Sequence, residues 1–451
     1  MNYQRQVLLF TLFFLVSLIA ATVLFHFYPS LAGSTLRPVN IVSEIVKDSA
    51  SNGKKSVVTK NGKIVKGNII VKDYLTEKSL INSSGDRFAL QLFLKKLAAL
   101  KKDKSRKVRI GYFGDSFIEG DLITQDLRKQ LQDTLGGDGV GFVPIRSITE
   151  GFRQTIIQHS SGDWEEVSFK SDNHASAQLF LSGHKFFPGN NSTVSFRASN
   201  QPHLDHFVHA QVLYGKASNG NNTTGSVSIN SQSYTLHAND VFNVDEINLG
   251  NCQAVNMSAS PSGIPIYGLS FETPAGIMVD NFSFRGISGV ELDNFSEDYL
   301  RAMQAKRPYD LLVFQYGPNL LFKGELVEFK WYQKKMLPIL QKLKKAFPQT
   351  SILLVSTADK GYKYAGAWRT QKGVEPLVDV QYDMANNAGL DFFNLYNAMG
   401  GENSMVKWAT ESPTLANKDY THVNFRGAKK IADIIYNAIM KEFDDYQKHG
   451  D

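Results

Sequence analysis

A polar run, Gly114-Asp115-Ser116, directly follows a stretch at 107–113 that predicts a β-strand, and a helical pattern begins at about Leu122. A side chain at the carboxyl end of a parallel strand lies where open α/β sheets bind ligands. The free N–H groups at the start of the next helix suit a developing oxyanion. A serine in this position can act as a nucleophile. It can equally cap the helix, because Asp and Ser are common capping residues.

A serine nucleophile needs a base, and only one of the ten histidines is placed for that task. His422 ends the run DYTH just before the last predicted helix, whereas the others lie near the N-terminus, in a β-rich segment or in the C-terminal tail. Asp419, three residues earlier, can close a short turn in which its carboxylate meets one ring nitrogen of His422. The other ring nitrogen is then free to take the Ser116 proton. Helix capping is again the alternative.

Two further runs could supply hydrogen-bond donors to an oxyanion. GPN at 317–319 and GISG at 286–289 each directly follow a predicted strand. The carboxyl ends of parallel strands open onto the same edge of a sheet. We therefore expect the Asn319 side chain and a glycine N–H to lie at the same edge as Ser116.

These four blocks, FGDSF, GISG, YGPN and DYTH, resemble in order and spacing those of the SGNH (GDSL) hydrolases. The resemblance implies that Ser116 is the nucleophile, His422 the base and Asp419 its orienting partner. It also implies an oxyanion hole made by the N–H groups of Ser116 and Gly289 and by the side chain of Asn319. No metal or other cofactor is implied.

The resemblance covers residues 105–150 and 279–442. Gly289 is preferred to Gly286 because a Ser-Gly context is usual in the family. The chain departs from the family pattern at two places: Pro318 stiffens the asparagine block, and Glu119 follows the nucleophile block where it could crowd or contact substrate.

Three side chains outside the four blocks could contact substrate. Glu119 follows the nucleophile block closely enough to reach it, and Trp368 and Trp408 lie in stretches that could border the cleft.

The runs LGGDGVGF at 135–142 and MGG at 399–401 resemble a subgroup of SGNH enzymes. That subgroup includes peptidoglycan O-acetylesterases with a β-sandwich, carbohydrate-binding-module-like insertion between the first two blocks. The β-rich segment at 151–278 falls in that interval. The resemblance implies removal of O-acetyl groups from a cell-envelope glycan through an acetyl-Ser116 intermediate.

Three other functions stay open. An O-acetyltransferase would use the same triad with a glycan hydroxyl as acceptor, and a glycan-binding envelope protein would not use it at all. A lipase or thioesterase would need a long apolar groove, which the polar residues at 360–373 do not suggest.

The hydropathy pattern predicts a three-layer α/β/α domain with a parallel sheet, because continuous apolar runs suit strands covered on both faces. Strands are expected at 107–113, 277–284, 309–315, 351–357 and 390–395, and helices from about 87 and at 122–135, 293–305, 325–346, 374–388 and 424–442. The predicted organisation is a membrane anchor at 1–28, a stalk at 29–80, the SGNH domain at 81–150 and 279–446, and an inserted β-sandwich at 151–278.

Residues 7–25 carry no charge and are long enough to span a bilayer as a helix. Arg5 before them places the bulk of the chain outside the cytoplasm. We expect a periplasmic or other extracytoplasmic protein tethered to the inner membrane by this helix. If the run Ser30-Leu31-Ala32 is a cleavage site, the protein is instead secreted.

The net charge, the cysteine count and the histidine spacing argue against a nucleic-acid site, a disulfide and a metal site. The formal charge is only +6, and no basic run indicates nucleic-acid binding. The single cysteine, Cys252, cannot form a disulfide within the chain. His203, His206 and His209 are three residues apart, a spacing that alternates faces in a strand and does not favour a metal site.

Overall fold

The computed structural model describes residues 78–172, 178–218 and 223–450, which lie within one compact unit, Val71–Asp451. The predicted anchor and most of the predicted stalk therefore lie outside the described residues. Within the described residues, no helix combines the length and the apolar character needed to cross a bilayer. Leu80, the last residue of the predicted stalk, is buried in the core.

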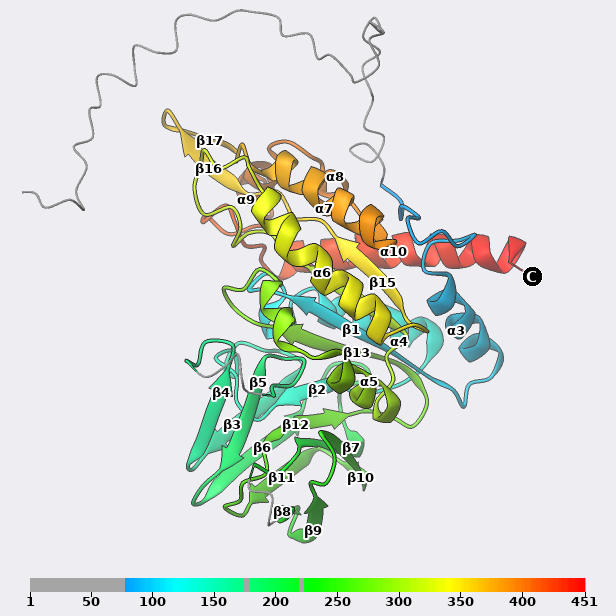
Figure 1. Cartoon of the computed structure of the whole chain (residues 1–451), viewed down its shortest axis with the longest axis vertical. Helices are drawn as coiled ribbons and strands as arrows, with labels where there is room; N and C mark the ends of the chain where they lie inside the picture. Colours follow the sequence, from blue (N-terminus) through cyan, green and yellow to red (C-terminus); the bar gives the residue numbers. More distant parts are fainter. Residues whose placement is uncertain (1–77, 173–177, 219–222, 451) are drawn as a thin grey trace, which may run out of the picture. The chain divides into compact units, whose positions relative to one another are not determined.

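Five parallel strands form the central sheet in the order β13-β1-β14-β15-β18 (Figure 1). Their bounds are β1 (Lys107–Gly114), β13 (Gly276–Ser283), β14 (Leu311–Gln315), β15 (Ser351–Val355) and β18 (Asp391–Phe393). All five lie within two residues of the predicted strands at their amino ends. The predicted parallel sheet is confirmed.

Helices cover both faces of this sheet, as the continuous apolar strands require. One face packs on α3 (Gln91–Lys102), α4 (Thr124–Leu135) and α10 (Phe425–His449). The other packs on α5 (Glu297–Lys306), α6 (Lys330–Ala346) and α7 (Val374–Ala388). Short helices complete the α/β part: η4 (Glu119–Asp121), η6 (Val290–Asn294), α8 (Leu395–Met399) and α9 (Ser404–Thr410).

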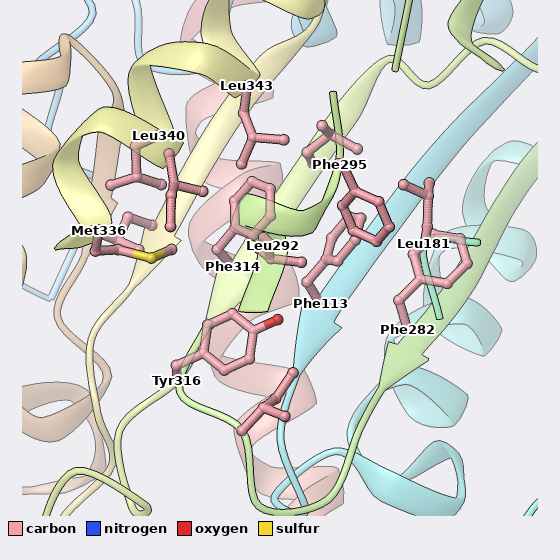
Figure 2. Close-up of a cluster of buried hydrophobic side chains, with 14 of the residues drawn as sticks. Phe113, Leu181, Phe282, Leu292, Phe295, Phe314, Tyr316, Met336, Leu340 and Leu343 are labelled. Atoms are coloured by element: carbon pink, nitrogen blue, oxygen red, sulfur yellow. The ribbon is translucent and has the colours of Figure 1, made fainter. Parts of the chain in front are cut away.

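Alternating side chains along each strand divide between the two helical layers. On β1, Val108, Ile110 and Tyr112 face the layer of α3, α4 and α10, whereas Phe113 faces the opposite layer. Figure 2 shows that second core, in which Phe113 packs between Phe282 and Phe314 of the neighbouring strands, with ring centroids 4.9 and 4.8 Å away. Leucines and Met336 of α6 close over these rings.

Within the described residues, eleven further strands lie between α4 and β13 in the sequence and form two antiparallel sheets. One sheet has the order β10-β7-β12-β5-β4 with β2 also paired to β12, and the other has the order β3-β6-β11-β8-β9. A shared apolar core joins the two sheets. The bounds are β2 (Gly141–Pro144), β3 (Ile156–Ser161), β4 (Trp164–Ser168), β5 (His184–Pro188), β6 (Ser192–Ala198), β7 (Phe207–Gly215), β8 (Thr224–Ile229), β9 (Gln232–His237), β10 (Phe242–Cys252), β11 (Ala254–Ala259) and β12 (Ile266–Phe271).

Strand β12 is buried along its whole length. Phe142, Leu213 and Tyr267 from this sheet pack in the same core as Phe282 and Phe314 of the parallel sheet. The described residues therefore cluster as one unit, and a separate domain at 151–278 stays a prediction. Strand β2, which lies before residue 151, belongs to this antiparallel sheet rather than to the parallel one.

A buried ionic network also joins the parallel sheet to β12. Arg307, which caps the C-terminus of α5, donates to Asp280 Oδ2 on β13 (2.6 Å) and to Ser270 Oγ on β12 (2.7 Å). Arg109 on β1 donates to both oxygens of Glu272, just beyond β12 (2.7 and 2.9 Å). Burial raises the pKa of Glu272, but Arg109, Arg307 and Lys107 outweigh burial and lower it to about 2.

Candidate active site

Ser116 lies two residues beyond the end of β1 and is half-buried. The preceding Asp115 is buried and accepts the Phe117 N–H at Oδ1 (2.9 Å), which fixes the turn that carries Ser116. In the described parts of the chain, the Ser116 N–H meets no hydrogen-bond acceptor. Helix α4 begins at Thr124, two residues later than the predicted start at Leu122. The free N–H groups of its first turn are therefore farther along the chain from Ser116 than predicted. The short helix η4 occupies the gap.

The structure brings Ser116, His422 and Asp419 together at the carboxyl edge of the parallel sheet. Ser116 Oγ lies 3.0 Å from His422 Nε2, and His422 Nδ1 lies 2.8 Å from Asp419 Oδ2. The two hydrogen bonds therefore form a continuous relay through three side chains, and Ser116 and His422 are 306 positions apart in the sequence. Such a relay lets a base take the serine proton while a carboxylate stabilises the charged imidazole.

A tight turn holds the aspartate of this relay. Asp419 Oδ1 accepts the backbone N–H groups of Thr421 (2.9 Å) and His422 (3.0 Å). Burial raises the pKa of Asp419, but the hydrogen bonds from His422 and Thr421 outweigh it and lower the pKa to about 2. The carboxylate is therefore ionised at neutral pH. The turn ends at Asn424, which caps α10 through its side chain.

A cavity of about 720 Å³ opens at Ser116 and His422. Its apolar wall includes Phe152 and Phe425, whose rings stack with centroids 5.1 Å apart. Phe152 comes from the β-rich segment and Phe425 from the start of α10. The antiparallel part of the chain therefore helps to shape the cleft at the serine.

Asn319 follows β14 and donates one amide hydrogen to the Ile287 carbonyl (2.8 Å). An amide group has two hydrogens, so the second can serve another acceptor. Gly289 differs from expectation, because its N–H already donates to Glu291 Oε2 (3.1 Å). Glu291, which lies within η6, accepts the Ser288 N–H in the same way. Gly286 is exposed, and its N–H meets no acceptor among the described residues.

Lys360 was not predicted, yet it connects two of the four blocks. It follows β15, and its ammonium donates to the carbonyls of Pro318 (3.0 Å) and Leu321 (2.7 Å) in the asparagine block. The next residue, Gly361, donates its N–H to the carbonyl of Tyr420 in the DYTH turn (2.7 Å). The only sequence signal is that Lys360 follows a predicted strand and so lies at the same sheet edge.

The three predicted substrate contacts have different positions. Glu119 lines the cleft, and its carboxylate accepts from the Arg285 guanidinium (Nε, 2.8 Å). Trp368 lies on β17 (Ala367–Thr370), which pairs with β16 (Gly361–Tyr364), and stacks on Tyr420 at 4.1 Å.

The prediction for Trp408 is wrong. This side chain is only 2% exposed, because α9 turns it into the core that it shares with Met405 and α10.

The histidines of the β-rich segment are engaged separately. His203 lies between Asp138 (2.8 Å) and Asp133 (2.9 Å), and His206 pairs with the adjacent Asp205 (2.8 Å). Across the residues that the structure describes, no group of three or more His, Cys, Asp and Glu side chains is arranged to hold a metal ion.

No family model matches the sequence, and no curated protein matches it significantly. Among solved structures, one described as a peptidoglycan O-acetylesterase in action matches at a TM-score of 0.67 and 18% identity, over 81% of this chain and 99% of that chain. The chain shares the fold of that peptidoglycan O-acetylesterase. The resemblance predicted from the sequence blocks is therefore confirmed at the level of the fold.

Two other solved structures overlap with smaller parts of the chain. An acetyl xylan esterase matches 36% of this chain at 18% identity and a TM-score of 0.28. A family two carbohydrate esterase from Cellvibrio japonicus matches 64% of this chain at 10% identity and a TM-score of 0.26. Overlaps at such low TM-scores do not by themselves establish a common fold.

Proposed function

We propose that the protein is a serine esterase that removes O-acetyl groups from a cell-envelope glycan, with O-acetylated peptidoglycan as its substrate. The observation that carries the proposal is the relay from Ser116 Oγ through His422 to Asp419 at an open cleft. Support for the glycan comes from the shared fold with a peptidoglycan O-acetylesterase.

In the proposed reaction, His422 Nε2 takes the Ser116 proton as Oγ attacks the acetyl carbonyl carbon. The bond between the acetyl carbonyl carbon and the sugar oxygen then breaks, and that oxygen receives the proton from His422. Water next attacks acetyl-Ser116, again with His422 as base, and releases acetate. Asp419 stays ionised and stabilises the imidazolium in both steps.

The oxyanion needs donors near Ser116 Oγ. The Ser116 N–H and the second hydrogen of the Asn319 amide are available for that purpose. The Gly289 N–H would first have to leave Glu291, so we assign the leading role to Ser116 and Asn319.

The location of the protein is part of the same proposal. Residues 7–25, which lie outside the described part, would anchor the chain and place the esterase on the extracytoplasmic side, where envelope glycans are found.

The test uses full-length protein in detergent and O-acetylated peptidoglycan, with released acetate as the readout. We expect Ser116→Ala to lower acetate release by about 10⁴- to 10⁶-fold, as for loss of a serine nucleophile in related triads. The matched control is Ser105→Ala, an exposed serine before β1 that should change nothing. Equal activity of the wild type and Ser116→Ala would refute the proposal. Acetyl transfer to a glycan acceptor without acetate release would reassign the protein as a transferase.

A further inference from the structure

A second cavity, of about 340 Å³, lies beside the cleft at Ser116. The two cavities share four lining residues: Glu119, Ile148, Thr149 and Arg285. The far wall of the second cavity comes from the antiparallel sheets and includes Arg146, Lys170, Ser182 and His184. A polymer bound at Ser116 can therefore extend into this cavity without leaving the protein surface.

The carboxylates that line the second cavity are already engaged by the protein. Glu119 accepts from Arg285, and Asp121 accepts from Arg128 (2.8 Å) and Arg153 (3.1 Å).

The remaining two carboxylates are engaged as well. Glu166 pairs with His184 (2.8 Å), and Glu150 accepts the Ser147 N–H (3.1 Å) and the Ser160 hydroxyl (3.2 Å). These acids therefore have little capacity left for a ligand.

Two cations in the same wall form no ion pair among the described residues, although the charge of Arg146 contributes, after the hydrogen bond from His184, to lowering the pKa of Glu166. The Arg146 guanidinium is held by neutral oxygens, those of Ser160 Oγ (3.3 Å) and the Gly162 carbonyl (3.0 Å) among them. The Lys170 ammonium lies 5.5 Å from the centre of the Phe284 ring and forms no ion pair in the described parts of the chain. Arg146 is thus fixed in place and Lys170 is free to move toward a ligand.

A buried hydroxyl in this wall also lacks a partner. Ser182 is 5% exposed, and its Oγ meets no hydrogen-bond donor or acceptor among the residues that the structure describes. Buried polar atoms of this kind are uncommon, and a ligand group is one way to satisfy them.

An aromatic ring in the wall supports two of these polar side chains. Phe284, which directly precedes Arg285, is only 5% exposed, stacks with the His184 ring at 4.7 Å and lies under Lys170. It therefore positions His184 and Lys170 at the cavity.

We propose that the second cavity binds a carboxylate of the same glycan chain whose acetyl ester lies at Ser116, carried by the acetylated unit itself or by the next carboxylate-bearing unit along the chain, with Arg146 and Lys170 as the residues that meet the carboxylate. This inference rests on the proposed function, because it assigns both cavities to one glycan chain. In peptidoglycan the carboxylate can belong to the lactyl group of the sugar or to the stem peptide, and both present the same chemistry.

The test measures binding and turnover separately. Binding uses full-length protein carrying Ser116→Ala, so that no ester is cleaved, and calorimetry with three probes. These are O-acetylated glycan strands freed of stem peptide, strands with intact stem peptide, and stripped strands whose carboxylates have been converted to neutral amides. Turnover uses the same strands and a small aryl acetate with Ser116 present.

Arg146→Gln should raise the Kd and the KM for carboxylate-bearing strands about tenfold, because a charged hydrogen bond is lost. Lys170→Gln, at an exposed side chain, should raise them about two- to fivefold. Neither variant should change binding of the amidated strands or cleavage of the aryl acetate. Lys102→Gln, an exposed lysine at the end of α3, is the control for the change in net charge.

The probes also separate the possible outcomes. An effect confined to stripped strands assigns the carboxylate to the sugar, and an effect confined to intact strands assigns it to the peptide; either supports the inference. An equal effect on amidated strands, or none on any strand, refutes it. If the wild type cleaves no ester, the proposed function fails, but calorimetry still reports on the cavity. If Arg146→Gln disturbs the loop that Arg146 holds, Lys170→Gln still tests the inference.

Discussion

Two pairs of oppositely charged groups show how differently this molecule uses ionic contacts. Asp419 and His422, at the sheet edge, have side chains that are 48% and 37% exposed. Asp280 and Arg307, between the parallel sheet and β12, are both 0% exposed. The first pair lies in a turn beside an open cleft, and the second joins two sheets in the buried interior.

The difference in solvent determines what each pair can do. An exposed pair contributes about 0–1 kcal/mol to stability, so its protonation can change during a reaction without unfolding the protein. Loss of one partner from a buried pair leaves an uncompensated charge and costs about 3–5 kcal/mol. The exposed pair is therefore suited to chemistry, and the buried pair to holding the β-rich part against the sheet that carries Ser116.

The largest effect on stability that we expect concerns the buried pair. Arg307→Met should lower the free energy of unfolding by about 3–5 kcal/mol, because Asp280 stays buried without its cation. Urea unfolding followed by tryptophan fluorescence measures the change. Arg301→Met on the same helix is the control, since Arg301 pairs with Glu297 at the surface and should cost less than about 0.5 kcal/mol. Similar losses for the two variants would contradict the distinction between buried and exposed pairs.

The second prediction tests Asn319, at the carboxyl edge of the parallel sheet. Asn319→Ala should lower kcat for an aryl acetate about 100- to 1000-fold, because one oxyanion donor is lost. The free energy of unfolding should fall by only about 1 kcal/mol, the usual contribution of a hydrogen bond such as that to Ile287. Steady-state kinetics and urea unfolding measure the two quantities, with the exposed Asn239→Ala as control. A large loss of stability with little loss of kcat would show that Asn319 is structural only.

Asp115 extends the comparison between the exposed and the buried ion pair. It is buried like Asp280 but forms no ion pair within the described residues. Burial raises its pKa to about 6, although the N–H groups of Phe117 and Gly317 lower it in part. A carboxyl whose pKa is raised by folding stabilises the native state below its unfolded pKa of about 3.8, and this stability is lost as the pH rises through about 6. The loss amounts to at most about 3 kcal/mol.

Unfolding measured between pH 4 and pH 7 tests this prediction. The wild type should lose stability across that range relative to Asp115→Asn, because asparagine does not ionise. Parallel pH profiles for the two proteins would show that Asp115 does not titrate in this range.

Several features were predictable from the sequence because they depend on local pattern. Continuous apolar runs identified the five parallel strands, and the polar residues at their carboxyl ends identified Ser116 and Asn319. The hairpin β16–β17 was missed, because its exposed residues carry no apolar alternation. The prediction that residues 7–25 form a membrane-spanning anchor falls outside the described residues and stays a prediction.

The sequence by itself determined which residues end the strands and that Asp419 precedes His422 by one turn, because both follow from short-range spacing. Only the tertiary structure decided which side chains meet across long separations. Packing of α9 buried Trp408, Glu291 engaged the Gly289 N–H, and Arg285 met Glu119 at the wall that both cavities share. Such contacts depend on how helices and sheets pack, and no periodicity along the chain encodes them.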